Sequence, residues 1–86
     1  MRFQGALIKE QGVIFGIIVV KPHVLQNQAD ANTMRSFGSR VFGSVPIILM
    51  AQNSRGVPTY LGRRDIVNFI SRISISRIPW REYTVA

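Results

Sequence analysis

Residues 13–52 form a stretch that reads VIFGIIVVKPHVLQNQADANTMRSFGSRVFGSVPIILMAQ, and its pattern indicates the central elements of the fold. It contains two apolar runs, VIFGIIVV and VPIILM, that are continuous and rich in β-branched residues. Such runs are typical of strands that are buried on both faces, as in a parallel sheet. Between them, residues 28–42 have the apolar spacing of a helix. This order predicts a β-α-β unit in which the strands over 13–21 and 45–52 are parallel.

The predicted helix over 28–42 carries signals at both ends. Asn27 or Gln28 begins it, and Asp30 places a carboxylate in the first turn, where the helix dipole favours negative charge. Gly43 is a predicted stop, because helices often end on a glycine in a left-handed conformation. Gly38 weakens the helix interior but permits a close approach to a strand. The buried face is expected to consist of Ala31, Met34, Phe37 and Val41.

The flanking segments extend this unit on both sides. Residues 2–9 are expected to form a hairpin with the strand over 13–21. The turn Asn53-Ser54-Arg55-Gly56 leads to a short strand over 57–61, and a helix is expected over 63–73. The tail over 74–86 is an irregular segment or a last strand. The sequence therefore predicts an α/β fold, with α+β as the alternative: a small β-β-α-β-β-α sandwich with a mixed sheet and a C-terminal tail, in a single domain over 1–86.

Composition narrows the classes of function. The 86 residues include no cysteine and one histidine, His23, so disulfides, thiolate catalysis and Cys-type zinc sites are excluded. The few acids stand on different predicted elements and no nucleophile motif is present, so we expect no catalytic residues, no metal site and no cofactor. The longest apolar run is far shorter than the roughly 20 residues that span a bilayer. We expect a cytoplasmic protein that has no membrane partner.

The charge favours an anionic partner. Eleven basic residues against four acidic ones give a formal charge of +7, and nine of the basic residues are arginine. Arginine suits planar, bidentate contacts with phosphate or carboxylate groups. We therefore expect a non-enzymatic binding module for nucleic acid or for a phosphorylated or acidic ligand. The alternative interpretation of the charge is an ordinary solvated surface.

The carboxyl ends of the two parallel strands carry one candidate site. Open α/β sheets bind ligands beyond these ends. An anion pocket is predicted there from two cations, an imidazole and an amide, and the alternative is that they are ordinary strand-end residues. The four residues are Lys21, His23, Asn53 and Arg55.

A second candidate site lies in the last third of the chain, where arginines are interleaved with aromatic residues. This combination is used to bind single-stranded nucleic acid, through phosphate neutralisation and base stacking. The predicted residues are Arg63, Arg64, Arg72, Arg77, Trp80, Arg81 and Tyr83. The alternative is that Trp80 anchors the core or a dimer interface. We expect a homodimer, because the strands over 2–9 and 57–61 are predicted to be open edges and the tail is free to reach a neighbour. Such a dimer would be a structural or adaptor protein.

Residues 42–73 resemble the C-terminal half of a thioredoxin-fold protein. The resemblance is carried by Phe42-Gly43-Ser44-Val45-Pro46 before a buried strand, then by the turn over 53–56, by Leu61-Gly62, and by the final helix. It implies a cis peptide bond between Val45 and Pro46. The family's redox pair is a Cys-x-x-Cys motif, and this chain has no cysteine, so no redox residue is carried over.

Overall fold

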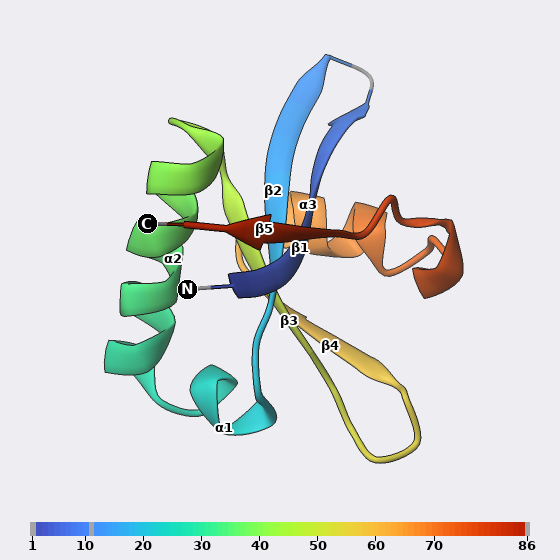
Figure 1. The fold of residues 1–86 in the computed structure, drawn as a ribbon. Helices are drawn as coiled ribbons and strands as arrows, with labels where there is room; N and C mark the ends of the chain where they lie inside the picture. The colour runs from blue at the N-terminus through green and yellow to red at the C-terminus, as the bar shows by residue number, and fades with distance from the viewer. Residues whose placement is uncertain (1, 11, 86) are drawn as a thin grey trace.

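The computed structural model describes residues 2–10 and 12–85. Within these residues a mixed five-stranded sheet has the order β4-β3-β2-β1-β5 (Figure 1). The strands are β1 (Arg2–Glu10), β2 (Val13–Val19), β3 (Ile47–Gln52), β4 (Pro58–Leu61) and β5 (Arg81–Thr84). The helices are α1 (Pro22–Leu25), α2 (Gln28–Phe42) and α3 (Arg64–Ile70), with a single 3-10 turn η1 (Ile75–Arg77). No helix among the described residues is long and apolar enough to cross a membrane.

The strand pairing confirms the predicted fold class. β2 and β3 are parallel, in a register that pairs Gly16 with Ile47, and α2 lies between them in the chain. The β1–β2 and β3–β4 pairs are antiparallel hairpins, as expected from the short turns that join them. β5 adds an antiparallel strand to the outer side of β1. The tail is therefore a last strand over residues 81–84, which resolves the alternative left open by the sequence.

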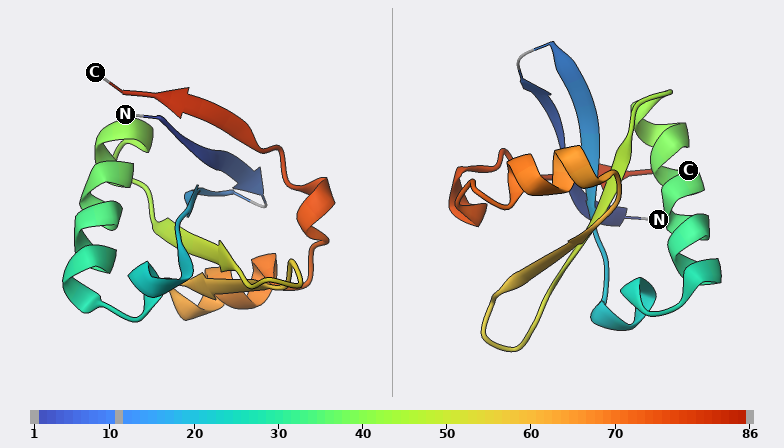
Figure 2. Two further views of the ribbon diagram at one scale, coloured as in Figure 1. Left: turned by 60° about the horizontal axis from the view of Figure 1, so that its bottom comes forward. Right: turned by 180° about the vertical axis from the view of Figure 1, so that it is seen from behind.

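The two longer helices cover opposite faces of the sheet, which gives three layers (Figure 2). Side chains of a strand alternate between the two faces. On the α3 face, Phe15 and Ile17 of β2 pack with Ile66 and Ile70 of α3. On the α2 face, Ile18 of β2 belongs to the second core cluster: Phe3, Ile18, Ala31, Ile47 and Leu49. Each face of the sheet thus has a core of its own.

Two glycines let α2 pack closely on the sheet. A Cβ atom at Gly38 would lie 2.6 Å from Cδ1 of Ile18, so the glycine permits the close approach that the sequence predicted. A Cβ atom at Gly16 of β2 would lie 2.5 Å from the ring of Phe42, the last residue of α2. The aromatic end of α2 therefore sits directly on β2.

The termini of α2 follow the predicted signals. The Asn27 side chain accepts a hydrogen bond from the N–H of Asp30 at 3.1 Å and caps the helix. Gly43 follows the last turn with φ of 89°, in the left-handed region that glycine tolerates.

Other expectations are wrong. The strand predicted over 13–21 ends at Val19, and α1 begins at Pro22, because proline is favoured at the first helical position. α3 ends at Ile70 rather than at 73, because the N–H groups of Arg72 and Ile73 bond back three residues instead of four.

Two further corrections concern strand β1 and the thioredoxin-like stretch. β1 is not an open edge along its whole length, since β5 pairs with residues 2–5. The peptide bond between Val45 and Pro46 is trans, so the cis bond implied by the resemblance is wrong.

Candidate functional site

Strand β1 pairs with β5 over residues 2–5 and with β2 over residues 5–10, so its two halves have different partners and the ladders overlap at Gly5. β5 pairs with residues 2–5 of β1, and the pair of Gly5 with Arg81 is the last of that ladder. β2 continues to pair with β1 as far as Glu10. Among the described residues, no strand pairs with the outer side of residues 6–10. We call residues 6–10 the free half of β1.

Main-chain polar groups of the free half point outward. Gly16 of β2 donates its N–H to the carbonyl of Pro46 at 2.9 Å, on the β3 side. Gly16 therefore directs its main-chain groups away from β1, and its cross-strand partner Leu7 directs its own away from β2. Alternation along the strand gives Lys9 the same orientation as Leu7. The N–H and C=O groups of Leu7 and Lys9 are thus available to another strand.

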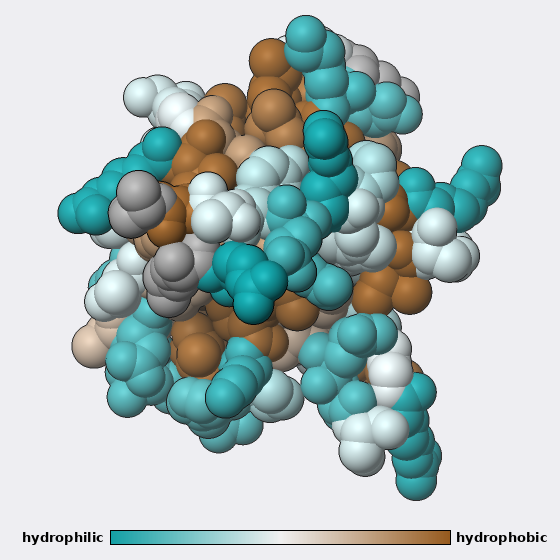
Figure 3. All heavy atoms as spheres, in the orientation of Figure 1, coloured by the Kyte–Doolittle hydropathy of each residue, from teal (hydrophilic) through white to brown (hydrophobic). Residues whose placement is uncertain are grey.

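A hollow lies beside the free half on each face of the sheet, and Leu7 and Pro79 line both. The α3-side hollow has a volume of about 530 Å³, and its apolar wall combines the strand with α3 and the tail: Ile8, Phe69, Ile70, Ile73 and Ile78. The α2-side hollow has a volume of about 460 Å³ and an apolar lining of Val41, Phe42 and Tyr83. Figure 3 shows hydrophobic atoms at the surface on both sides of the polar band over the centre of the molecule.

The rim of these hollows is positively charged. Lys9, Arg77 and Glu10 line the α3-side hollow, and Arg81 lines the α2-side hollow. All of these residues are exposed. The ion pairs among the described residues, Arg2 with Glu82 and Arg63 with Asp65, involve none of them. The free half therefore combines outward main-chain groups, apolar hollows and an excess of basic side chains.

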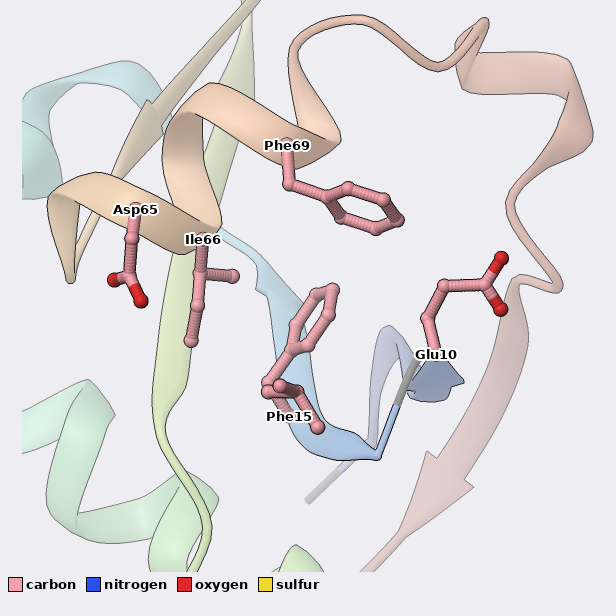
Figure 4. Close-up of a pocket in the computed structure, with 6 residues that line it drawn as sticks. Glu10, Phe15, Asp65, Ile66 and Phe69 are labelled. Atoms are coloured by element: carbon pink, nitrogen blue, oxygen red, sulfur yellow. The ribbon is translucent and has the colours of Figure 1, made fainter.

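A third hollow, of about 170 Å³, lies between α3 and the tip of the β1–β2 hairpin. Two of the four acids, Glu10 and Asp65, line it, although the sequence placed them on separate elements. Figure 4 shows their carboxylates at opposite ends of the hollow, with the rings of Phe15 and Phe69 between them. The carboxylates do not converge on one point, as general acid–base catalysis by two acids requires.

Asp65 is also held by a neighbour on its other side. The Arg63 guanidinium makes two hydrogen bonds to its carboxylate, at 2.9 and 2.7 Å. This hydrogen bonding lowers the pKa of Asp65 from 3.8 to about 2. Asp65 is therefore a charged partner of Arg63 at the start of α3, rather than a proton donor in this hollow.

The predicted anion pocket consists of exposed residues on two separate segments. Lys21 and His23 lie at the start of α1, whereas Asn53 and Arg55 belong to the turn between β3 and β4. Figures 1 and 2 show that α1 and this turn diverge from the end of the sheet. The Asn53 side chain accepts hydrogen bonds from the N–H groups of Arg55 and Val57, which shapes the turn. The pocket stays a prediction.

The aromatic residues of the second predicted site are used in packing. Tyr83 stacks on Phe3, with ring centroids 5.3 Å apart, and meets Phe42 edge to face at 5.1 Å. Trp80 is half-buried and donates its indole N–H to the carbonyl of Ile75 at 2.9 Å.

The predicted arginines of this site are distributed over different elements. Arg63 and Arg64 lie at the start of α3, and Arg63 is paired with Asp65. Arg72 follows the end of α3 and is exposed. Arg77 and Arg81 line the hollows beside the free half. Of the predicted arginines, these two lie beside the free half of β1, on opposite faces of the sheet.

Comparisons with known proteins found no match, so the site is described from its own residues. No protein-family model matches the chain. A search of curated proteins finds no match. A search of solved structures finds none either.

Sequence reasoning missed the residues that form the apolar part of the site, Leu7 and Ile8 on β1 and Phe69, Ile73 and Pro79 around them. One signal was present, because the strand over 2–9 was expected to be an open edge. The missing information was that the tail covers residues 2–5 and leaves residues 6–10 uncovered.

Proposed function

We propose that this protein is a non-enzymatic binding module that adds an extended segment of a partner protein to its sheet, along the free half of β1. The observation that carries the proposal is the outward orientation of the main-chain groups of Leu7 and Lys9, where the β5 ladder has already ended at Arg81. Strand addition at an open edge takes its affinity from such main-chain hydrogen bonds and its specificity from pockets for alternate side chains. Hollows on both faces provide such pockets.

The chain itself keeps this edge open. Continued in register, β5 would place Pro79 opposite Leu7 and Arg77 opposite Lys9. Proline has no N–H to donate to the ladder. Like charges directly opposite each other destabilise a strand pair. The indole N–H of Trp80 also bonds to the carbonyl of Ile75, which holds Trp80 against η1 within the tail. The tail, as far as the structure describes it, therefore does not fit the position as a strand.

The contacts favour a protein segment over nucleic acid as the ligand. Tyr83 packs between two phenyl rings, which leaves it poorly placed to stack on a base. The free arginines of α3 and the tail lie on different elements, whereas the apolar hollows adjoin a main-chain edge. The proposed setting remains the cytoplasm, in keeping with a small domain that contains no cysteine.

Hydrogen exchange on the full chain tests the proposal. Random peptides displayed on phage are selected against the immobilised protein, and the selected peptides are then synthesised. In the free protein, we expect the amides of Leu7 and Lys9 to exchange fast and that of Ile8 to exchange slowly, because Ile8 bonds to β2. On peptide binding, Leu7 and Lys9 become protected. Leu7→Pro removes an outward donor without breaking the β1–β2 ladder and abolishes binding.

The controls separate this site from the others. Circular dichroism checks that the Leu7→Pro protein keeps its fold. Selection of no peptide, or protection confined to the outer side of β4, overturns the proposal. Binding of a single-stranded DNA oligonucleotide in place of any peptide overturns it in favour of nucleic acid. A concentration-dependent mass of the protein alone, with protection of Leu7 and Lys9 in the dimer, overturns it in favour of self-association.

A further inference from the structure

We infer that the segment bound at the free half of β1 is acidic and carries two adjacent apolar residues flanked by carboxylates; this inference rests on the proposed function. Paired residues of neighbouring strands share a face of the sheet. A ligand residue opposite Ile8 therefore faces the α3-side hollow, and the next residue, opposite Leu7, faces the α2-side hollow. Two consecutive apolar side chains thus enter opposite hollows.

The two hollows have the size and lining for bulky side chains. The α3-side hollow, at about 530 Å³, is bounded by isoleucines of the strand, α3 and the tail. The α2-side hollow, at about 460 Å³, is bounded by the ring of Phe42 and by Leu7, whose surface is 46% exposed. Leu7 is the most exposed large apolar residue of β1, and a bound side chain on this face would cover it. Removing such surface from water favours binding.

The charged side chains on the rim favour carboxylates in the ligand, on both sides of its two apolar residues. The ligand residue opposite Lys9 shares the face of the Lys9 side chain, where a carboxylate makes a favourable cross-strand pair. At the other end, the ligand terminates near Arg81, with Arg77 on the opposite face. Three cations against Glu10 leave this rim net positive, so it attracts carboxylates and repels ammonium groups.

Three end-blocked synthetic peptides test the inference on the full chain. The acidic probe is Ser-Thr-Glu-Val-Leu-Asp-Thr-Ser. The basic probe has lysine in place of Glu and Asp, and the polar probe has serine in place of Val and Leu. We expect the acidic probe to bind about tenfold more tightly than the basic probe at low salt, with the difference shrinking toward parity in about 1 M salt. The polar probe is expected to bind too weakly to measure.

Charge-reversal variants localise the effect. Arg77→Glu combined with Arg81→Glu is expected to remove or invert the preference for the acidic probe. Arg55→Glu combined with Lys21→Glu is the matched control, since both residues are exposed, on the turn between β3 and β4 and at the start of α1, and this double reversal changes the net charge by the same amount. Hydrogen exchange at Ile8 verifies that each variant keeps the β1–β2 ladder.

The outcomes distinguish this inference from the proposed function. Equal binding of the acidic and basic probes at low salt, with protection of Leu7, overturns the charge preference but leaves strand addition standing. Equal binding of the acidic and polar probes overturns the role of the hollows. If no probe binds but display selects other peptides that protect Leu7 and Lys9, the inferred ligand class is wrong. If display also selects nothing, the proposed function itself fails.

Discussion

The two halves of β1 belong to one strand, but their apolar side chains differ in burial. Phe3 and Leu7 are apolar residues on the same face, yet Phe3 is 9% exposed and Leu7 is 46% exposed. Phe3 is enclosed by Phe37 of α2, at a ring distance of 5.1 Å, and by Tyr83 of β5. Leu7 lies level with Phe42, the last residue of α2, and beyond the start of β5. The neighbours of the strand, rather than the strand itself, therefore decide which half is core and which is surface.

We expect the largest loss of stability from a substitution in the buried half of β1. Phe3→Ala removes the ring that α2 and β5 share, and we expect a loss of about 3–5 kcal/mol in the free energy of unfolding. Leu7→Ala is the matched change in the free half, and its effect should stay within about 0.5 kcal/mol, as for most surface positions. Urea unfolding of both variants measures the difference. Equal losses would mean that Leu7 is part of the core and that the free half is not free.

A substitution at Pro79 should allow β5 to pair with the free half of β1 as it pairs with the first half. Pro79→Val restores an N–H opposite Leu7 and lets β5 extend along the free half. The expected result is slow hydrogen exchange at Leu7 in the unliganded variant, together with weaker binding of any peptide at this edge. Lys9 should stay fast, because Arg77 still opposes it. Unchanged exchange at Leu7 would show that the bond between Trp80 and Ile75, and not Pro79, ends the β5 ladder.

Local patterns predicted most of the fold, because apolar runs, turn residues and helix caps mark where its elements begin and end. Continuous β-branched runs marked β2 and β3, and the cap at Asn27 and the stop at Gly43 bounded α2. The pairing of β5 with β1 could not be predicted in the same way. It joins the two ends of the chain, and it depends on Phe3 stacking on Tyr83, which no local pattern encodes.

The candidate site was less predictable for the same reason. The anion pocket was inferred from the adjacency of β2 and β3, and that adjacency is confirmed. However, β3 continues to Gln52, beyond its last pair with β2, which is Val19 with Met50. The turn that contains Arg55 therefore lies farther out than the end of β2. Leu7 and Pro79 gain their roles from the point at which β5 begins, which is a property of the packed tail. An open edge exists where a neighbouring strand is absent, whereas sequence patterns indicate only the strands that are present.

The weakest effect is expected at Asp65, in the first turn of α3. Asp65 lines the same hollow as Glu10, and Arg63 lowers its pKa from 3.8 to about 2. Because the folded-state pKa is lowered, this pair stabilises the protein above the ordinary pKa of the carboxyl group, and the contribution is lost as the pH falls toward 2. Asp65→Asn should therefore lower the urea midpoint slightly at pH 7 and leave it unchanged near pH 2.

The ion pair of Arg63 and Asp65 also affects the charge near the free half of β1. While Arg63 holds Asp65, Glu10 is the carboxylate that opposes an acidic ligand at the rim. Arg63→Gln frees the Asp65 carboxylate and should raise its pKa toward 3.8, as followed by NMR titration of the side chain. It should also weaken the acidic probe slightly at low salt, and less than Arg81→Glu does, because Asp65 lines the hollow behind the free half rather than the rim. A larger loss of affinity for the acidic probe from Arg63→Gln than from Arg81→Glu would mean that the ligand lies over α3 and does not bind at the free half.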